Sequence, residues 1–233
     1  MKIAIMQPYF MPYIGYFQLI NAVDKFVIYD NIKYTKKGWI NRNRILVNGK
    51  PEYISLPIKK DSDFLNINER VLSDSWKNER RKLLNKLKAS YAKSPFYSLV
   101  VILLEDILNH SEINLFNFIF NSIQKVCHYL DIETPLVKSS SLDIDCSLKG
   151  ALKVIKICNC LKSNSYVNPI GGINLYNKNE FLRSYIHLTF LKSDEIIYNQ
   201  SLDCFLPFLS IIDILMFNSK PNIKVFLNKW ANE

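Results

Sequence analysis

The start of the chain constrains its fold most, because two short apolar runs flank a loop and an amphipathic stretch. Residues 3–6 are apolar, residues 7–15 form a proline-punctuated loop, residues 17–23 are amphipathic, and the second apolar run covers 25–30. This order is typical of the strand–loop–helix–strand unit that opens an α/β fold with a parallel sheet. Such folds bind ligands beyond the carboxyl ends of their strands. We therefore expect a functional site at residues 7–15.

The rest of the chain alternates between strands and helices, with helices concentrated in the middle. Asn48-Gly49 separates two strand-like runs, which is the strongest short signal for a hairpin. No repeat or linker divides the sequence, so we predict one α/β domain over residues 1–233, with a parallel sheet, a helical insertion at about 76–130 and C-terminal helices. The predicted elements are hairpin strands 45–47 and 52–56, helices 76–93, 97–109 and 115–130, strand 135–138, helix 148–161, strand 165–167, helix 178–184, strand 187–191, and helices 208–217 and 221–230.

Composition is that of a soluble globular protein, with 48% hydrophobic and 22% charged residues. No window approaches the roughly 20 uncharged apolar residues of a membrane-spanning helix, and the N-terminus lacks the features of a signal peptide. We expect no membrane span and a cytoplasmic location.

An odd number of cysteines in apolar surroundings favours reduced thiols, and their spacing does not match a zinc site, so no metal is expected. The cysteines are Cys127, Cys146, Cys158, Cys160 and Cys204.

The net charge of +9 restricts the partners that the chain can favour. Such a charge suits nucleic acid, an acidic membrane surface, a phosphorylated substrate or an acidic protein. The sequence is rich in Lys, Ile and Asn throughout, which makes scattered lysines weak indicators. No zinc finger, aromatic RNP motif or GxxG clamp is present. We therefore expect no nucleic-acid partner.

The entrance to the first predicted helix reads Tyr13-Ile14-Gly15-Tyr16. This layout resembles the HIGH superfamily of nucleotidyltransferases, which place His-x-Gly-His after the first strand to hold phosphates. The resemblance implies a Rossmann-like (HUP-like) sheet and anion binding at the helix N-terminus. Tyrosine supplies no cation at neutral pH, so the usual adenylyl transfer is disfavoured. The alternative is that Tyr13 and Tyr16 are core aromatics.

A second candidate region, from Tyr34 to Arg44, combines cations with aromatic and amide side chains. Arginine binds phosphate through two hydrogen bonds, lysine acts as a point charge, and Trp or Tyr offers a flat face to a base or sugar. A diphosphate-linked sugar requires this set of groups, whereas the alternative is a solvated surface loop. The residues concerned are Tyr34, Lys36, Lys37, Trp39, Asn41, Arg42, Asn43 and Arg44.

A third candidate region lies in the second half of the chain. Gly171 and Gly172 precede a predicted helix, where a backbone without side chains can approach a ligand closely. Tyr176, Tyr198 and Gln200 follow them in sequence. Asp213 lies within an otherwise apolar helix, and the ordinary expectation is that it pairs with a core cation or a backbone amide.

Few residues offer acid–base chemistry. Asp30 ends the second predicted strand and is well placed to accept a proton from an amine or hydroxyl. His187, at the start of a predicted strand, is the best candidate among three histidines. A covalent intermediate on Cys158 or Cys160 is a further alternative.

Five sets of residues closely resemble the WbqC-like family over nearly the whole chain. The sets are residues 6–17, residues 36–43, Gly171-Gly172 with Leu175-Tyr176, Tyr198 with Gln200, and residues 209–213 with Phe217-Asn218. This resemblance implies a role in bacterial surface-polysaccharide biosynthesis, in O-antigen (lipopolysaccharide) gene clusters. The resemblance indicates the pathway in which the protein acts more firmly than the reaction that it catalyses.

Pathway and residues together predict a transferase that acylates or aminoacylates the amine of a nucleotide-diphosphate-linked amino sugar. The donor would be a thioester of coenzyme A or of an acidic carrier protein, with no resident cofactor. A nucleotidyltransferase that activates a sugar phosphate or an acid, and a non-catalytic binding protein, are alternatives. The sugar, the donor and the oligomeric state stay open. Expected catalytic residues are Asp30 and His187, and expected substrate-binding residues are Gln7, Pro8, Tyr13, Gly15, Tyr16, Tyr34, Lys36, Lys37, Trp39, Asn41, Arg42, Asn43, Gly171, Gly172, Tyr176, Tyr198 and Gln200.

Overall fold

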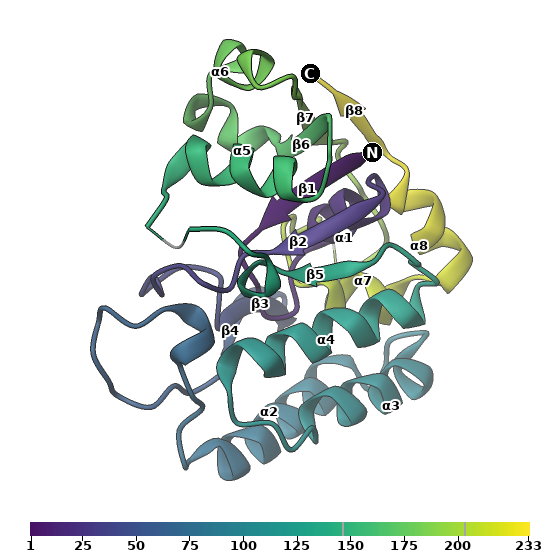
Figure 1. Ribbon diagram of the computed structural model, residues 1–233. Coiled ribbons are helices and arrows are strands. Elements are labelled where there is room, and N and C mark those ends of the chain that lie inside the picture. Colours follow the sequence, from purple (N-terminus) through teal and green to yellow (C-terminus); the bar gives the residue numbers. More distant parts are fainter. Residues whose placement is uncertain (146, 203) are drawn as a thin grey trace.

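Six strands form one sheet in the order β5-β2-β1-β6-β7-β8 in the computed structural model, which describes residues 1–145, 147–202 and 204–233 (Figure 1). All neighbouring strands run parallel except β7 and β8. This is the order of a Rossmann-like sheet with an antiparallel edge strand. The α/β prediction with a parallel sheet is confirmed. The strands are β1 (Lys2–Met6), β2 (Lys25–Ile28), β5 (Leu136–Lys138), β6 (Ser165–Pro169), β7 (His187–Ser193) and β8 (Trp230–Asn232).

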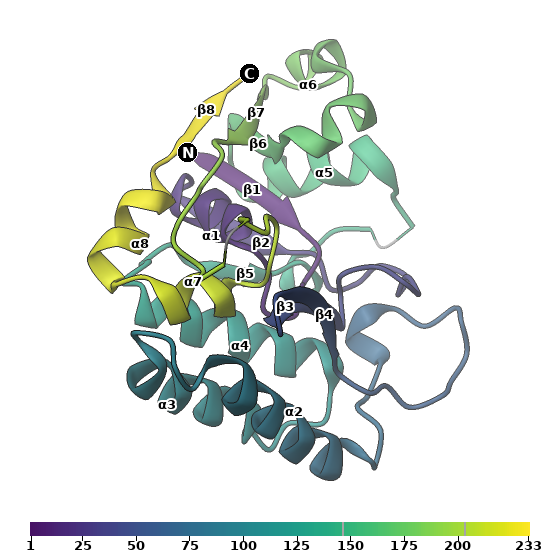
Figure 2. The same ribbon diagram turned by 180° about the vertical axis from the view of Figure 1, so that it is seen from behind.

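Helices cover both faces of this sheet, because alternate side chains of each strand point to opposite sides. Ala4 of β1 belongs to the apolar cluster shared with α1, α7 and α8, whereas Ile3 and Ile5 belong to the cluster shared with α5 and α6. Figure 2 shows α7 and α8 beside α1. These helices are α1 (Ile14–Asn21), α5 (Gly150–Cys160), α6 (Lys178–Arg183), α7 (Ile211–Phe217) and α8 (Lys220–Leu227).

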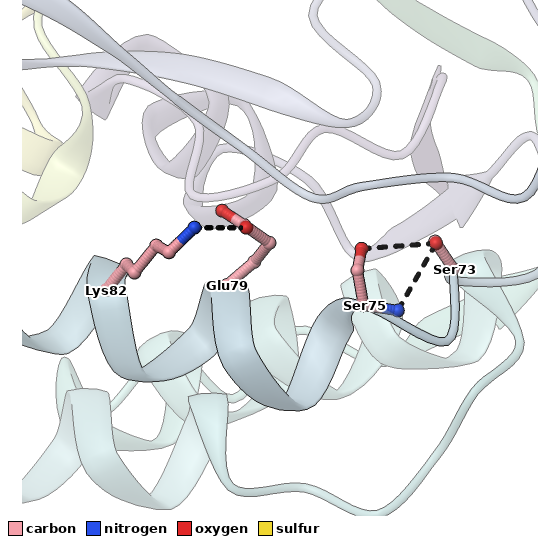
Figure 3. Close-up of polar contacts among 4 residues, drawn as sticks. All are labelled: Ser73, Ser75, Glu79 and Lys82. Carbon is pink, nitrogen blue, oxygen red and sulfur yellow. Dashed lines mark hydrogen bonds and ion pairs between the residues drawn. The ribbon is translucent and has the colours of Figure 1, made fainter.

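The helical middle of the chain packs against the same cluster as α1. It consists of α2 (Trp76–Tyr91), α3 (Tyr97–Leu108) and α4 (Leu115–Tyr129), whose apolar faces are buried. Just before α2, the Ser73 hydroxyl accepts hydrogen bonds from the backbone N–H and the hydroxyl of Ser75 (Figure 3). One turn into the helix, Glu79 and Lys82 form an exposed ion pair at 2.8 Å. These polar contacts are local, and the N-cap residue Ser75 makes no side-chain hydrogen bond to the first turn of α2.

The predicted hairpin forms a separate two-stranded antiparallel sheet, β3 (Arg42–Val47) and β4 (Lys50–Ser55). Asn48 and Gly49 both adopt positive φ, at 49° and 76°. A two-residue type I′ turn requires this conformation at both positions. The hairpin is anchored to α2, because the Leu46 N–H donates to the Tyr91 hydroxyl at 2.9 Å.

The predicted helices and strands are present, and the differences concern their ends. The helix expected at 221–230 stops at Leu227, and Trp230–Asn232 instead pairs with β7. The helix expected from residue 208 begins at Ile211, because the Ser210 hydroxyl accepts from the Ile212 N–H as an N-cap. Gly171 and Gly172, expected to precede a helix, instead lie within the 3₁₀ helix η3 (Ile170–Leu175). Two further 3₁₀ helices in the described ranges are η1 (Ile67–Glu69) and η2 (Ser139–Ser141). Cys146 lies outside the described residues.

Within the described ranges, none of the helices has the length and apolarity needed to cross a bilayer. The same residues contain no group of three His, Cys, Asp or Glu side chains placed to hold a metal ion.

Candidate functional site

The sheet has a topological switch point between β1 and β6. α1 follows β1 on one face, and α6 follows β6 on the other. Connections that diverge in this way leave a crevice at the carboxyl ends of the two strands, where α/β folds bind ligands. A cleft of about 560 Å³ lies there, between the start of α1 and the loops after β6 and β7. Tyr13, Gly15, Pro169 and Gly171 contribute to its lining.

A second hollow, of about 330 Å³, lies where the opening loop meets the cationic segment. The Phe10 N–H donates to the Ile40 carbonyl at 2.9 Å, and the Asn43 side-chain amide donates to the Met11 carbonyl at 2.8 Å. The two segments singled out in the sequence therefore lie side by side. The lining residues of this aromatic hollow are Tyr9, Pro12, Tyr13, Trp39, Asn43, Arg44 and Phe208.

Tyr13 and Phe208 line both cavities and separate them. Their rings meet edge to face, with centroids 6.3 Å apart. Phe208 is 71% exposed and adopts a positive φ of 57°, a strained conformation for a bulky residue. A ligand that spans the cleft and the aromatic hollow would have to contact or move this ring pair.

Arg44 supplies positive charge to the aromatic hollow. Its guanidinium lies over the Trp39 ring, 5.5 Å from the centroid, and Trp39 stacks on Tyr53. Its Nε is buried without an acceptor among the described residues, and its other contact, with the Phe208 carbonyl, is long at 3.4 Å. A buried N–H without a partner is costly. Arg44 is therefore suited to bind an anionic group entering the hollow.

Arg42 orders the cationic loop instead of facing the hollow. Its guanidinium donates to the carbonyls of Lys37 and Gly38 and lies over Tyr53. Lys37 adopts a positive φ of 65° and is exposed, and it forms no ion pair with any residue that the structure describes. Lys36 forms an exposed ion pair with Asp63 at 2.6 Å.

Several expected ligand-binding side chains are used within the protein. Tyr16 is buried, and its hydroxyl donates to the Gln7 carbonyl at 3.0 Å, so it is a core aromatic. Burial raises the pKa of Tyr16 well above its ordinary value. Asn41 accepts from the Tyr34 hydroxyl and donates to the Leu56 carbonyl. Pro8 is buried at the base of the loop. Of the two tyrosines that flank Gly15, Tyr13, which is 38% exposed, is the one that faces the cavities.

The two glycines after β6, Gly171 and Gly172, have different roles. Gly171 is exposed and lines the cleft. Gly172 is buried against the Asn168 side chain, and any Cβ there would overlap the amide nitrogen. Tyr176 packs against Tyr166 and Phe181, with centroids 5.9 Å and 5.5 Å away, and lines neither cavity. Only Gly171 of this group reaches the candidate site.

Tyr198 connects the cleft wall to a buried carboxylate. Its hydroxyl donates to Asp213 Oδ2 at 2.6 Å, and the Gln200 amide donates to the same oxygen at 2.9 Å. The Tyr91 hydroxyl donates to Asp213 Oδ1 at 2.8 Å. The expected pairing of Asp213 with a cation or a backbone amide is wrong, because neutral side-chain donors satisfy it and no ion pair with it forms among the described residues. Burial raises the pKa of Asp213.

The two expected catalytic residues do not meet. Asp30 is 1% exposed beyond the end of β2, where Ser139, Ser140 and Asn68 donate to its carboxylate. His187 begins β7 and pairs in register with Ser165, at the amino edge of the sheet opposite the cleft. Neither side chain lines the cleft or the aromatic hollow.

The thiol alternative also finds little support. Cys158 is buried in the cluster beneath α5, and burial raises the pKa of its thiol to about 12. A thiol with such a pKa stays protonated and is a weak nucleophile. Cys160 is exposed on the same helix and lines neither cavity.

The cleft contains residues that the sequence reasoning missed. Asp194 and Glu195 follow the carboxyl end of β7 and line the cleft. Asp30 was predicted as a catalytic residue because its carboxylate follows the end of a strand, and Asp194 and Glu195 meet the same criterion. The sequence around Phe208 did not predict that this residue lines the cavities, because its position depends on contacts with Tyr13 and Arg44.

Gly15 allows the Tyr13 ring to take its place at the cavities. A Cβ at Gly15 would overlap that ring, whereas a Cβ at Gly171 would meet nothing within 4 Å. We expect Gly15→Ala to change the unfolding free energy by less than about 1 kcal/mol, because Tyr13 can swing outward and alanine favours helix. The displaced ring should nevertheless weaken ligand binding about fivefold, roughly 1 kcal/mol. Calorimetric titration with a nucleoside diphosphate measures this binding. Asn159→Ala, at an exposed position on α5 that lines neither cavity, is the control, and equal effects of the two variants would contradict the expectation.

Comparison with known proteins gives a family match over most of the chain. A sequence model of the WbqC-like protein family matches residues 7–225. The chain is 29% identical over 222 residues to a Mycobacterium tuberculosis protein described as "Uncharacterized protein Rv1507c", and the alignment covers 92% of each chain. No solved structure matches significantly.

Proposed function

The chain belongs to the WbqC-like protein family, and on that premise we propose that it is a transferase of surface-polysaccharide biosynthesis. Its substrate in this proposal is a nucleotide-diphosphate-linked amino sugar, and the group transferred is an acyl or aminoacyl group. The observation that carries the proposal is the meeting of the opening loop and the cationic segment at one hollow, joined to the switch-point cleft through Tyr13 and Phe208.

The aromatic hollow suits the nucleotide end of such a substrate. Tyr9 and Tyr13 offer aromatic surface to a base or sugar, and Trp39, which already contacts Arg44 and Tyr53, adds to the aromatic wall. Arg44, with its buried Nε lacking an acceptor, can bind a phosphate oxygen. Lys37 lies exposed on the adjoining loop and adds positive charge without a fixed partner. These groups match the charge and shape of a nucleoside diphosphate.

The switch-point cleft suits the sugar and the group transferred to it. Its volume of about 560 Å³ falls within the range of ligand pockets. Apolar side chains such as Leu19, Ile170 and Leu191 form much of its wall, and Asp194 and Glu195 lie at its rim. The apolar wall can accommodate an acyl chain, and the carboxylates can attract and deprotonate an amine. We propose Asp194 and Glu195 for this role in place of Asp30 and His187.

The proposed reaction balances without a bound cofactor. The sugar amine attacks the carbonyl of an acyl thioester, the C–N bond forms, and the C–S bond breaks. A cleft carboxylate takes the proton that the amine loses and returns it to the departing thiolate. If the donor is carried by an acidic protein, the net charge of +9 favours its docking.

Arg44→Met tests the nucleotide end of the proposal. Methionine keeps most of the side-chain volume and removes the charge, so binding of a nucleoside diphosphate should weaken about tenfold, which corresponds to about 1.4 kcal/mol. Titration calorimetry with uridine and thymidine diphosphates and their amino sugars measures the change.

Arg81→Met, an exposed position on α2, is the control for loss of one positive charge and should bind as the wild type does. If binding weakened equally in both variants, the effect would come from the overall net charge and not from a specific contact of Arg44. No binding of any nucleotide sugar to the wild type, in calorimetry or as thermal stabilisation, would remove the basis of the proposed function.

A non-catalytic binding protein of the same pathway is the second candidate. The observation that favours it is that Asp30 is saturated with donors and His187 lies at the opposite sheet edge. Mass spectrometry of amino sugars incubated with acyl thioesters separates the two candidates. Amide formation that stops in an Asp194→Asn, Glu195→Gln double variant supports the transferase, whereas tight binding without any product supports the binding protein.

A further inference from the structure

A third hollow lies along the cationic segment, apart from the two cavities described above. Its volume is about 400 Å³, and it shares no lining residue with the aromatic hollow or the cleft. We propose that this hollow is a separate anion site that binds a phosphate group, with Arg70 at its centre. The lining residues of this basic hollow are Lys33, Tyr34, Thr35, Lys36, Asp63 and Arg70.

Arg70 is a buried cation that forms no ion pair with an acidic side chain in the described part of the chain. It is 4% exposed, and neither its Nε nor its Nη2 has an acceptor among the described residues. Its guanidinium lies over the Tyr34 ring, 5.0 Å from the centroid. Burying a charged donor group without acceptors is costly, and an anion in the hollow would offset that cost.

The backbone holds Arg70 in place. Its N–H donates to the Ile67 carbonyl at 3.2 Å, and its carbonyl accepts from the Leu115 N–H at 2.9 Å. These bonds tie it to η1 on one side and to the start of α4 on the other. The backbone of Arg70 is thus fixed by two elements, and its guanidinium is buried against the Tyr34 ring, which reduces the entropy lost when a ligand binds.

Asp63 marks the position of an anion in the basic hollow. Its exposed carboxylate lies 2.6 Å from the Lys36 ammonium group. The hydrogen bond from Lys36 lowers the pKa of Asp63, and the charges of Lys36, Arg70 and Lys33 lower it further. Three cations thus act on one surface carboxylate. A phosphate dianion fits this excess of positive charge better than a single carboxylate does, and it would compete with Asp63 for Lys36.

The basic hollow and the aromatic hollow differ in what they can recognise. The aromatic hollow has four aromatic rings and one arginine, whereas the basic hollow has three cations around one ring. The ring of the basic hollow is that of Tyr34, which lies against Arg70 and donates its hydroxyl to Asn41 at 2.9 Å. The basic hollow therefore suits a compact phosphate group without a base. This inference does not depend on the proposed transferase activity.

Titration with inorganic phosphate against chloride at constant ionic strength tests the site, by calorimetry and by backbone amide shifts. Arg70→Met should weaken phosphate binding at least about tenfold, because a charge-assisted bond is lost. Asp63→Asn should strengthen it about threefold or more, because it removes the competing carboxylate. Lys60→Met, a nearby exposed position outside the hollow, should leave it unchanged.

The outcomes separate this site from the aromatic hollow. The backbone amide shifts that phosphate causes should fall on the residues lining the basic hollow. Shifts confined to Tyr9, Trp39 and Arg44 of the aromatic hollow, or a phosphate affinity that Arg70→Met leaves unchanged, would overturn the proposal. If Arg70→Met does not fold, the exposed pair Lys33→Met and Asp63→Asn decides: opposite shifts support the site, and equal or absent shifts overturn it. No phosphate binding to the wild type overturns it as well.

Discussion

Replacing Asp30 with alanine is expected to lower the free energy of unfolding by about 3 kcal/mol. Ser139 Oγ and the Ser140 N–H donate to Oδ1 at 2.8 and 2.9 Å, and Ser140 Oγ and Asn68 Nδ2 donate to Oδ2 at 2.6 and 3.1 Å. Alanine leaves these donors at a site that is 1% exposed at the aspartate. Unpaired buried donors carry the full cost of their desolvation. Urea denaturation followed by circular dichroism measures the loss.

Two further variants separate this structural role from a catalytic one. Asp30→Asn keeps the shape and one acceptor, so its loss of stability should be smaller than that of alanine. Asp24→Ala removes an exposed acceptor of the Lys2 N–H at the other end of the same strand and should change stability little. If Asp30→Ala folds as stably as the wild type but forms no product, the structural role is refuted and Asp30 acts in the chemistry.

The sequence located Asp30 correctly but did not reveal its partners. Its position after a predicted strand places it at the carboxyl edge of the sheet, as the structure shows. Its partners come from η1 and η2, which are remote in sequence and give no local signal. The sequence could have shown that His187 lies away from the candidate site, since a residue that starts a parallel strand lies at the edge of the sheet opposite the ligand site.

Secondary structure followed local patterns wherever these were strong. Periodic apolar residues and the Asn48-Gly49 turn predicted α2 to α4 and the hairpin almost to their ends. The strand Trp230–Asn232 was not predictable, because it has one large apolar residue and depends on pairing with β7. The start of α7 depends on the Ser210 cap, which competes with the apolar pattern that continues upstream to Phe208.

The candidate site was predictable in its segments but not in its details. Aromatic and cationic residues beside a strand end indicated the aromatic hollow, and the structure brings both segments to it. The sequence did not show which side chains face the aromatic hollow, because this depends on burial. Tyr13 is exposed and Tyr16 is buried, although both flank the same glycine. Arg70 and Phe208 reach their cavities only through tertiary contacts, so sequence spacing gave no sign of them.

The buried carboxylate of Asp213 should make stability depend on pH with a definite sign. Burial raises its pKa in the folded protein, while hydrogen bonds from Tyr198, Tyr91 and Gln200 oppose part of that shift. The unfolded value is about 3.9. Because the folded state holds the proton more tightly, the group's contribution is complete below about pH 3.9 and is lost as pH rises through the folded pKa.

Asp213→Ala isolates this effect, because alanine does not titrate and leaves Tyr91, Tyr198 and Gln200 without their acceptor. We expect a loss of about 3 kcal/mol near pH 4, which shrinks toward neutral pH by about 1.4 kcal/mol per unit of pKa shift. Urea titrations of both proteins from about pH 4 to about pH 8 give the difference directly. Asp213→Asn should show the same trend with a smaller loss, and Tyr198→Phe, which keeps the carboxylate, should not flatten it. A difference that stays constant or grows with pH would mean that the buried carboxylate is stabilised in its ionised form.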